Sequence, residues 1–455
     1  MDSIITAVIN AANYICGMPV LYAAAAVSII LLISMRGFVV IHAGHIFKQI
    51  TGKGKKQTSD KGISSFSACC TALANTLGVG NIAGIAVGLA YGGPGALFWI
   101  WVAGLLGVAI KYSEATLGAK FRSIDPATGM YRGGIMWYIE QGAGKKWKWL
   151  AVLFASVYGF TDLTVPAVQI NSIVGVFSTT WNIPPISIGL ISAALIAFVL
   201  LGGIRRLSDM ANKVIPFAAA LYFVVSLILL ITHFTALPDV IKDVFVCAFT
   251  GSAAAGGFAG ATAIAALRHG IMRGFYSNGA ATGDAAFAHS VADVDHPVKQ
   301  GMWGATEVVI DTIVCSCTAL AILSTGVLET GLEGTALTTA AFAAFIGNEG
   351  IAALFVGIIV ALFAFTTAVA CAYYGEICVQ YLIKNQKILK YVIPIFRFTL
   401  CAFAVVGSVM PLGILWTIND YCLVICMFIC MTALLLNRKH VAELTKDYFN
   451  TYLKK

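Results

Sequence analysis

Charged residues are scarce in this chain. They make up 11% of its 455 residues, and 59% of the residues are hydrophobic, whereas soluble domains carry about 25% charged residues. This composition excludes an ordinary soluble globular protein. The apolar runs also lack strict alternation and are far longer than the roughly 10 residues of a barrel strand. We therefore predict an all-α membrane protein.

Motifs for chemistry at a reactive centre are also missing. The sequence shows no Ser/His/Asp set, no His-rich metal cluster, no glycine-rich phosphate loop and no CxxC pair with partner spacing. Most of its twelve cysteines lie in apolar runs, where cysteine behaves as a small buried hydrophobe. We expect no enzyme, no catalytic residues, no cofactor and no transition-metal site.

Eleven apolar runs predict eleven transmembrane helices. The predicted spans are 18–40, 63–91, 93–119, 148–177, 185–202, 212–233, 251–275, 298–325, 350–383, 389–410 and 412–437.

Lysine and arginine gather in alternate loops, and this asymmetry sets the orientation of helical membrane proteins. Lys242 is the only basic residue assigned to the other loops. We predict a multi-pass plasma-membrane protein with its N-terminus outside and its C-terminus in the cytoplasm, and we expect no cleavable signal peptide. The net charge of +8 then reflects insertion and attraction to the lipid bilayer rather than nucleic-acid binding. The basic segments are 48–61, 120–148, 205–213, 268–299, 384–390 and 438–455.

The chain divides into an accessory helix and two halves of five helices. Because five is an odd number, the two halves must lie in opposite orientations across the membrane, as in inverted-repeat transporters. The predicted units are an accessory helix (1–47), a basic linker (48–62), a first repeat (63–233), a second repeat (251–437) and a cytoplasmic tail (438–455).

A glycine pair interrupts the second apolar run. Residues 75–81 read Asn-Thr-Leu-Gly-Val-Gly-Asn, and glycine inside a helix costs roughly 1 kcal/mol relative to alanine. Broken helices that offer backbone groups to substrates and ions are typical of secondary transporters. The alternative is a close helix–helix contact, which small residues also permit. Gly256-Gly-Phe-Ala-Gly260 occupies the matching place five spans later, with a flexible, packed Gly/Ala helix as its alternative.

These motifs resemble those of the alanine or glycine:cation symporter family. The resemblance covers about 64–382 and implies a LeuT-type five-plus-five inverted repeat with one extra N-terminal helix, sodium-driven uptake and a small amino-acid substrate. It is carried, in family order, by Gly78-Val-Gly-Asn-Ile-Ala-Gly84, Gly92-Gly-Pro-Gly-Ala-Leu-Phe-Trp-Ile-Trp101, Lys111-Tyr-Ser-Glu114, Gln169-Ile-Asn-Ser172, Gly256-Gly-Phe-Ala-Gly260, Asp295-His-Pro-Val-Lys-Gln-Gly301, Asp311-Thr312 and Tyr373-Tyr-Gly-Glu376.

The resemblance also implies residue roles. The backbone at Gly78–Gly80 would hold the substrate carboxylate, and the Asn81 side chain would reach a cation. A second sodium site would use the carbonyls of Ala74, Leu77 and Phe363 with the hydroxyls of Thr366 and Thr367. Threonine hydroxyls can alternatively bond to their own helix. The full predicted substrate set is Asn75, Gly78, Val79, Gly80, Asn81, Asp162, Gln169, Gly256, Gly257, Phe258, Ala259 and Cys371.

The chain departs from the family pattern at several positions. Cys371 stands where the family commonly has tryptophan, so the pocket is expected to admit substrates larger than alanine. Asp284 replaces a small residue of the family. Asp162 lies inside an apolar run, where a carboxylate is a candidate for binding a substrate ammonium, a cation or a proton. Its alternative is a protonated or partnered aspartate at the extracellular vestibule.

Four other acidic residues are expected to form ion pairs rather than to bind substrate. The acidic residues are Glu114, Glu307, Asp311 and Glu376, and the predicted partners are Lys111, Arg268 and Arg273.

The sequence thus predicts a symporter that couples inward sodium flow to uptake of a small neutral amino acid by alternating access. The substrate is expected in the alanine and glycine class or somewhat larger. The alternatives are a proton-coupled amino-acid transporter and an ion channel, and the oligomeric state stays open.

Overall fold

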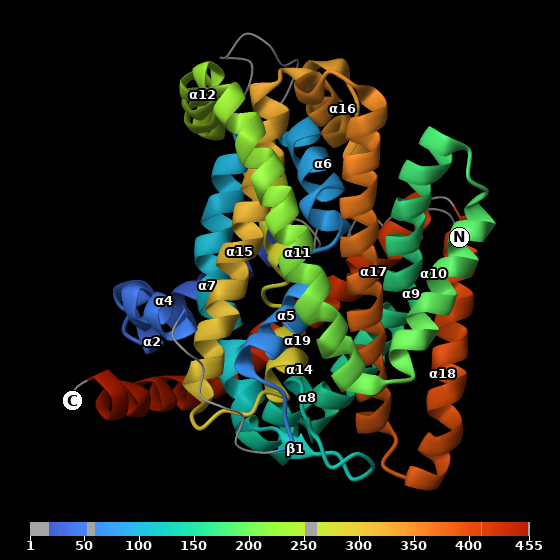
Figure 1. The fold of residues 1–455 in the computed structure, drawn as a ribbon. Helices are drawn as coiled ribbons and strands as arrows, with labels where there is room; N and C mark the ends of the chain where they lie inside the picture. The colour runs from blue at the N-terminus through green and yellow to red at the C-terminus, as the bar shows by residue number, and fades with distance from the viewer. Residues whose placement is uncertain (1–17, 52–59, 251–261, 411, 454–455) are drawn as a thin grey trace, which may run out of the picture.

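The computed structural model describes residues 18–51, 60–250, 262–410 and 412–453, and this part of the chain is almost entirely helical (Figure 1). Seven of its helices are long and apolar enough to cross a membrane. They are α7 (Ala96–Lys120), α9 (Lys148–Trp181), α11 (Gly203–Thr232), α15 (Pro297–Ser324), α17 (Glu349–Leu382), α18 (Gln386–Gly407) and α19 (Leu412–Tyr448).

An eighth span consists of two helices. α5 (Ser65–Thr76) and α6 (Ala83–Gly92) pass the same test together and are bent by 63°. Shorter helices occupy three further predicted spans: α2 (Met18–Ser34), α10 (Pro185–Leu200) and α13 (Ala263–Asn278). The all-helical membrane fold is confirmed, whereas length and composition do not confirm eleven crossings.

Several predicted boundaries were wrong. α11 begins at Gly203 instead of 212, and α19 continues beyond 437 to Tyr448. Both extensions carry charged residues, which end an apolar run without ending a helix. α13 continues past the predicted end at 275 to Asn278, while the first part of that predicted span, 251–261, lies outside the described residues.

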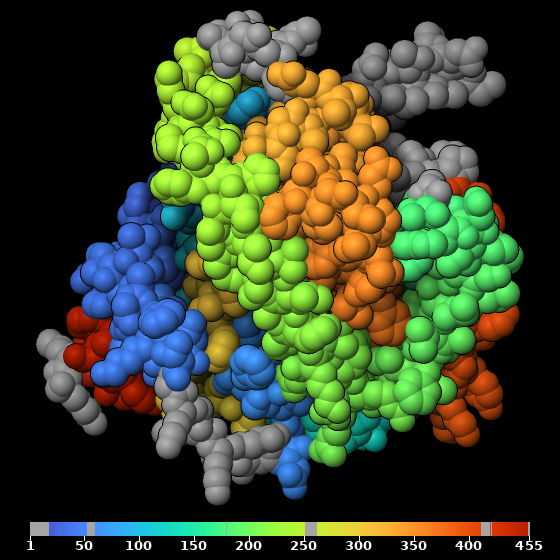
Figure 2. All heavy atoms as spheres, turned by 45° about the horizontal axis from the view of Figure 1, so that its top comes forward, coloured from blue at the N-terminus to red at the C-terminus, as the bar shows by residue number. Residues whose placement is uncertain are grey.

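The core of the molecule is built on two close helix contacts. α17 packs along α9, and α7 packs along α15 and α13. Small residues permit this approach: a Cβ placed on Gly304 would lie 2.8 Å from the Lys111 carbonyl oxygen. α2 packs on α7 and α19 at one edge of the body, and α10 and α18 form the opposite edge (Figures 1 and 2).

Short elements cover the two ends of the bundle (Figure 1). One end carries an antiparallel pair, β1 (Ser123–Ile124) with β2 (Tyr131–Arg132), followed by α8 (Ile135–Trp137) and a single π-helical turn at 138–143. α12 (Leu237–Thr250) and α16 (Gly334–Ile346) lie at the other end, where α16 packs beside α6 and α12 packs on α7 and α13. The remaining short helices are α3 (Phe38–Ile41), α4 (Ala43–Thr51), α14 (Ala285–Ser290), η3 (Lys145–Trp147), η4 (Phe234–Ala236), η6 (Val327–Thr330) and η7 (Phe449–Leu453).

The prediction that Arg268 and Arg273 lie at the same end of the bundle as the other basic segments was wrong. Arg273 packs on α6, because a Cβ placed on Gly88 would lie 3.1 Å from its Cγ. His269 stacks on Tyr91, whose hydroxyl donates to Glu333 over 2.9 Å near α16. The part of α13 that contains Arg268 and Arg273 therefore lies at the α16 end, opposite β1. The prediction failed because the seventh span was ended at 275, whereas α13 continues to Asn278.

Candidate substrate and ion site

The predicted break in the first core helix is confirmed. Ser64 caps α5 by accepting a hydrogen bond from the Ser67 N–H, and regular helix ends at Thr76. Gly78 is extended, and a 3-10 turn, η1 (Val79–Asn81), leads into α6. The Asn81 Oδ1 accepts a hydrogen bond from the Gly78 N–H at 2.9 Å. The freed backbone thus finds partners inside the protein, as hydrocarbon surroundings require.

A second interruption lies beside the first. α13 ends at Asn278 and α14 begins at Ala285, and the link contains left-handed Gly279, Ala281 and Gly283, with φ of 57°, 68° and 84°. The predicted interruption, with Gly256, Gly257, Phe258 and Ala259, falls outside the described residues. The signal for the observed break was the run Asn-Gly-Ala-Ala-Thr-Gly-Asp at 278–284, which is rich in turn-forming residues.

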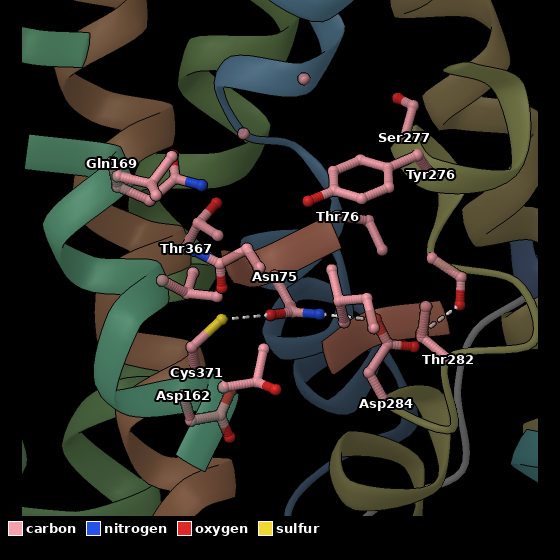
Figure 3. A pocket seen from close by; sticks show the side chains of 18 of the residues that line it. Asn75, Thr76, Asp162, Gln169, Tyr276, Ser277, Thr282, Asp284, Thr367 and Cys371 are labelled. Atoms are coloured by element: carbon pink, nitrogen blue, oxygen red, sulfur yellow. Dashed lines mark hydrogen bonds between the residues drawn. The ribbon is translucent and has the colours of Figure 1, made fainter. Parts of the chain in front are cut away.

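A cavity of about 90 Å³ lies where the two interruptions meet α9 and α17 (Figure 3). It brings together seven predicted residues: Asn75, Gly78, Gly80, Asp162, Gln169, Thr367 and Cys371. Residues that sequence reasoning did not place in the site complete its lining. They are Thr76, Tyr158, Thr161, Val165, Val168, Tyr276, Ser277, Gly279, Thr282, Asp284, Asn419 and Leu423.

Val79 lines a second, larger cavity instead. This cavity has a volume of about 990 Å³ and reaches from the break to the α16 end of the bundle. Arg273, Glu333 and Glu349 line it together with Asn171. It gives the broken helix an access route from that end.

The predicted second sodium site is assembled only in part. The Thr367 Oγ1 lies 3.4 Å from the Leu77 carbonyl oxygen and 2.9 Å from that of Phe363. These neutral oxygens come from both the broken helix and α17, and hard oxygen donors suit sodium. The Thr366 hydroxyl bonds only within α17, at 3.0 Å from the Leu362 and Phe363 carbonyls. Ala74 is buried in α5.

Asn81 joins a buried cluster that ties the two interruptions together. Its Nδ2 donates to the Ser277 Oγ at 2.9 Å and to the Asp311 Oδ1 at 2.5 Å. Ser277 also donates to the Asp311 Oδ2 at 3.0 Å. A buried carboxylate and a hydroxyl thus meet at the Asn81 amide nitrogen, while the amide oxygen is turned to the Gly78 N–H. The carboxylate and hydroxyl oxygens have the chemistry that sodium prefers.

The predicted ion pairs are confirmed only for Glu307, which lies 3.0 Å from the Lys111 Nζ. The prediction was wrong for Glu376, which pairs with Arg397 at 2.6 Å, and for Asp311, whose partners are Asn81 and Ser277. Glu114 accepts the backbone N–H of Ala281. Because these partners are distant in sequence, local sequence patterns do not reveal which residues pair.

Asn75 spans the floor of the cavity (Figure 3). Its Nδ2 donates to the Asp284 Oδ2 at 2.6 Å, and its Oδ1 accepts from the Cys371 Sγ at 2.9 Å. The other Asp284 oxygen pairs with the Lys111 Nζ at 2.7 Å. The charge of Asp284 is therefore compensated from behind the cavity wall.

The surroundings of Asp162 differ from those of Asp284. Asp162 is 1% exposed, and its Oδ2 has no hydrogen-bond partner. It faces the inner cavity and is absent from the lining of the 990 Å³ cavity. A buried carboxylate without a counter-charge is costly, so Asp162 stays a candidate for binding a substrate ammonium, a cation or a proton.

Two interrupted helices that meet at a buried polar cavity define the class of secondary transporters. The sequence model of the sodium:alanine symporter family matches residues 1–455, and the chain belongs to this family.

Two relatives resemble the chain in sequence, and a solved structure resembles it in fold. The chain is 36% identical to the "Sodium/alanine symporter AgcS" of Methanococcus maripaludis over 84% of both chains. It is 33% identical to the "Probable sodium/glutamine symporter GlnT" of Bacillus subtilis over 88% of this chain and 81% of that one. Its fold resembles that of MhsT in complex with L-phenylalanine, with a TM-score of 0.60 at 12% identity over 85% of this chain and 93% of the other.

Proposed function

We propose that this protein is a sodium-coupled symporter that takes up a small amino acid by alternating access. The observation that carries the proposal is the meeting of two helix interruptions at a cavity with an uncompensated carboxylate. Membership of the sodium:alanine symporter family supports it.

The substrate carboxylate would bind at the first interruption. Within Gly78–Gly80 the Gly78 N–H is held by Asn81, so the N–H groups of Val79 and Gly80 would meet the anion at the start of a helix. Gln169 lies next to this backbone, because a Cβ placed on Gly78 would be 3.7 Å from its side-chain amide atoms. The Gln169 Oε1 has no partner, so it can accept a hydrogen bond from the substrate ammonium.

Sodium would bind at two places that each join a broken helix to a continuous one. The first is Asn81, Ser277 and Asp311, and the second is Thr367 with the Leu77 and Phe363 carbonyls. A cation at either place would hold the interruption in its binding-ready shape. Since binding energy that differs between two conformations shifts their populations, sodium would thereby raise affinity for the substrate.

We further propose the membrane arrangement predicted from the basic loops, with the N-terminus outside and the C-terminus in the cytoplasm of a plasma-membrane protein. The first repeat would comprise 63–233 and the second 251–437, with 1–47 as an accessory helix, 48–62 as a linker and 438–455 as a tail. The cavity at the α16 end would then be the outer access route.

The test is uptake of radiolabelled alanine and glycine into proteoliposomes that contain the purified full-length protein. We expect saturable accumulation above equilibrium when sodium is high outside, and none when choline replaces sodium. Accumulation driven by a pH gradient without sodium would instead indicate proton coupling. Flux that never exceeds equilibrium would indicate a channel, and either result would overturn the proposal.

A further inference from the structure

Two unpaired acceptors lie on one wall of the inner cavity. Gln169 and Asp162 both project from α9 into it (Figure 3), and the Gln169 Oε1 and the Asp162 Oδ2 both lack partners. The two residues are seven positions apart, which corresponds to about 10 Å along a helix. An occupant of the whole cavity therefore meets one neutral acceptor and one carboxylate at opposite ends.

The described lining of the cavity offers Asp162 no counter-charge. Among the described residues that line the cavity, the charged ones are Asp162 and Asp284, and Asp284 is already held by Lys111. Behind Asp162, the backbone of α17 comes so close that a Cβ on Gly375 would lie 3.0 Å from the Asp162 Cβ. The base on the neighbouring helix, Arg397, forms two hydrogen bonds with Glu376.

Both polar atoms of the Asn75 side-chain amide already have hydrogen-bond partners, so neither is available to Asp162. The amide nitrogen donates to Asp284 and the amide oxygen accepts from Cys371. The positive partner of Asp162 must therefore come from the contents of the cavity. Cys371 leaves space beside this end, where the family resemblance would place a tryptophan.

We propose that the substrate is an α-amino acid whose short side chain ends in an ammonium group, and that Asp162 binds that group. This inference rests on the proposed function, which places the α-carboxylate at Gly78–Gly80 and the α-ammonium near Gln169. An ammonium compensates the buried charge, whereas a side-chain amide supplies donors and leaves the charge in place.

The size of the cavity suits such a molecule. A buried water needs roughly 10–15 Å³ of cavity volume on this measure, so 90 Å³ accommodates a compact substrate of several non-hydrogen atoms. A separation of about 10 Å between the two side-chain positions is filled by two hydrogen bonds and a chain of a few carbon atoms.

The experiment compares ornithine, glutamine and norleucine, whose side chains have the same length and end in an ammonium, an amide and a methyl group. Binding of each is measured by calorimetry on the purified full-length protein in sodium chloride and in choline chloride. We expect ornithine to bind at least about tenfold more tightly than norleucine in sodium, a gap of roughly 1.4 kcal/mol.

The Asp162→Asn variant should abolish the ornithine advantage, so that ornithine and norleucine bind within about twofold of each other, a difference of less than roughly 0.5 kcal/mol. Asp239→Asn removes a carboxylate from the exposed face of α12 and should behave like the wild type. The ligand comparison on the wild type does not depend on the folding of either variant.

Three results would overturn the inference. They are norleucine binding as tightly as ornithine in the wild type, an ornithine advantage that survives in Asp162→Asn, and a variant that needs more sodium for every ligand, which would assign Asp162 to an ion. If alanine and all three probes fail to bind in a sodium-dependent way, the proposed function itself is wrong.

Discussion

Thr366 and Thr367 are adjacent hydroxyls with different surroundings. Only Thr367 reaches the broken helix, at 3.4 Å from the Leu77 carbonyl oxygen. Thr367→Val keeps the shape and removes one oxygen, so we expect the sodium concentration for half-maximal alanine uptake to rise about tenfold, or roughly 1.4 kcal/mol. Thr366→Val is the matched control and should change it little. Unchanged sodium dependence in Thr367→Val would remove this residue from the ion site.

We expect Gln169 to bear on substrate rather than on sodium, because its amide lies beside Gly78, where the substrate carboxylate is proposed to bind. Gln169→Leu should weaken alanine binding about tenfold or more, by roughly 1.4 kcal/mol, while sodium binding without substrate stays nearly intact. Separate titrations with sodium and with alanine, followed by tryptophan fluorescence or calorimetry, distinguish the effect on sodium binding from the effect on alanine binding. A collapse of sodium affinity with unchanged alanine affinity would show that the role is misassigned.

Cys371 sets the width of the cavity, which it lines beside Asn75. Cys371→Trp should narrow the substrate range toward glycine and alanine through steric exclusion. Overpacking itself costs about 1–3 kcal/mol, so the folded fraction is measured first by size-exclusion chromatography. Competition by larger amino acids is then compared between variant and wild type. A folded variant with the wild-type profile would show that Cys371 does not face the substrate.

The sequence predicted some residues of the site well and others not at all. The break at 75–81 was visible because two glycines interrupt an apolar run. The Asn81, Ser277 and Asp311 cluster was not visible, because its members are 196 and 230 positions from Asn81. Asp284 was noticed as a departure, but its bonds to Asn75 and Lys111 depend on how three helices meet.

At the scale of helices, each predicted span coincides with a helix in the described part of the chain, but some ends were misplaced and eleven crossings are not confirmed. α13 is polar and contains Arg268 and Arg273, so its apolar run was ended early and the link at 279–284 was taken for a loop outside the membrane. A polar helix that faces a water-filled cavity lacks the signal that locates lipid-facing spans. Its assignment depends on turn residues, which local hydropathy does not weigh.

The α7–α15 contact leads to a prediction about stability. Gly304→Leu would push a side chain against the Lys111 backbone, where even a Cβ would lie 2.8 Å from the carbonyl oxygen. We expect a loss of about 1–3 kcal/mol of stability from overpacking, seen as a lower midpoint in thermal unfolding in detergent. Gly44→Leu on α4 is the control, since nothing lies within 4 Å of its Cβ position. Equal midpoints for both variants would contradict this packing.

On the scale of the whole molecule, the buried charges around the site do not balance. Asp162, Asp284, Glu307, Asp311 and Glu114 are all at most 4% exposed, and Lys111 is the lysine that pairs with two of them. Under the proposed function, cations bound at the two interruptions would offset the negative charge of these carboxylates, and this would favour binding of sodium together with substrate.

Reciprocal coupling tests this account most directly. If sodium and amino acid share one conformational equilibrium, each must raise the affinity for the other by the same factor. The measurement is influx of radioactive sodium into proteoliposomes with alanine added outside and no initial sodium gradient. The account predicts saturable, alanine-dependent sodium influx whose half-maximal sodium concentration rises about tenfold in Thr367→Val. Sodium influx that is the same with and without any amino acid would contradict it.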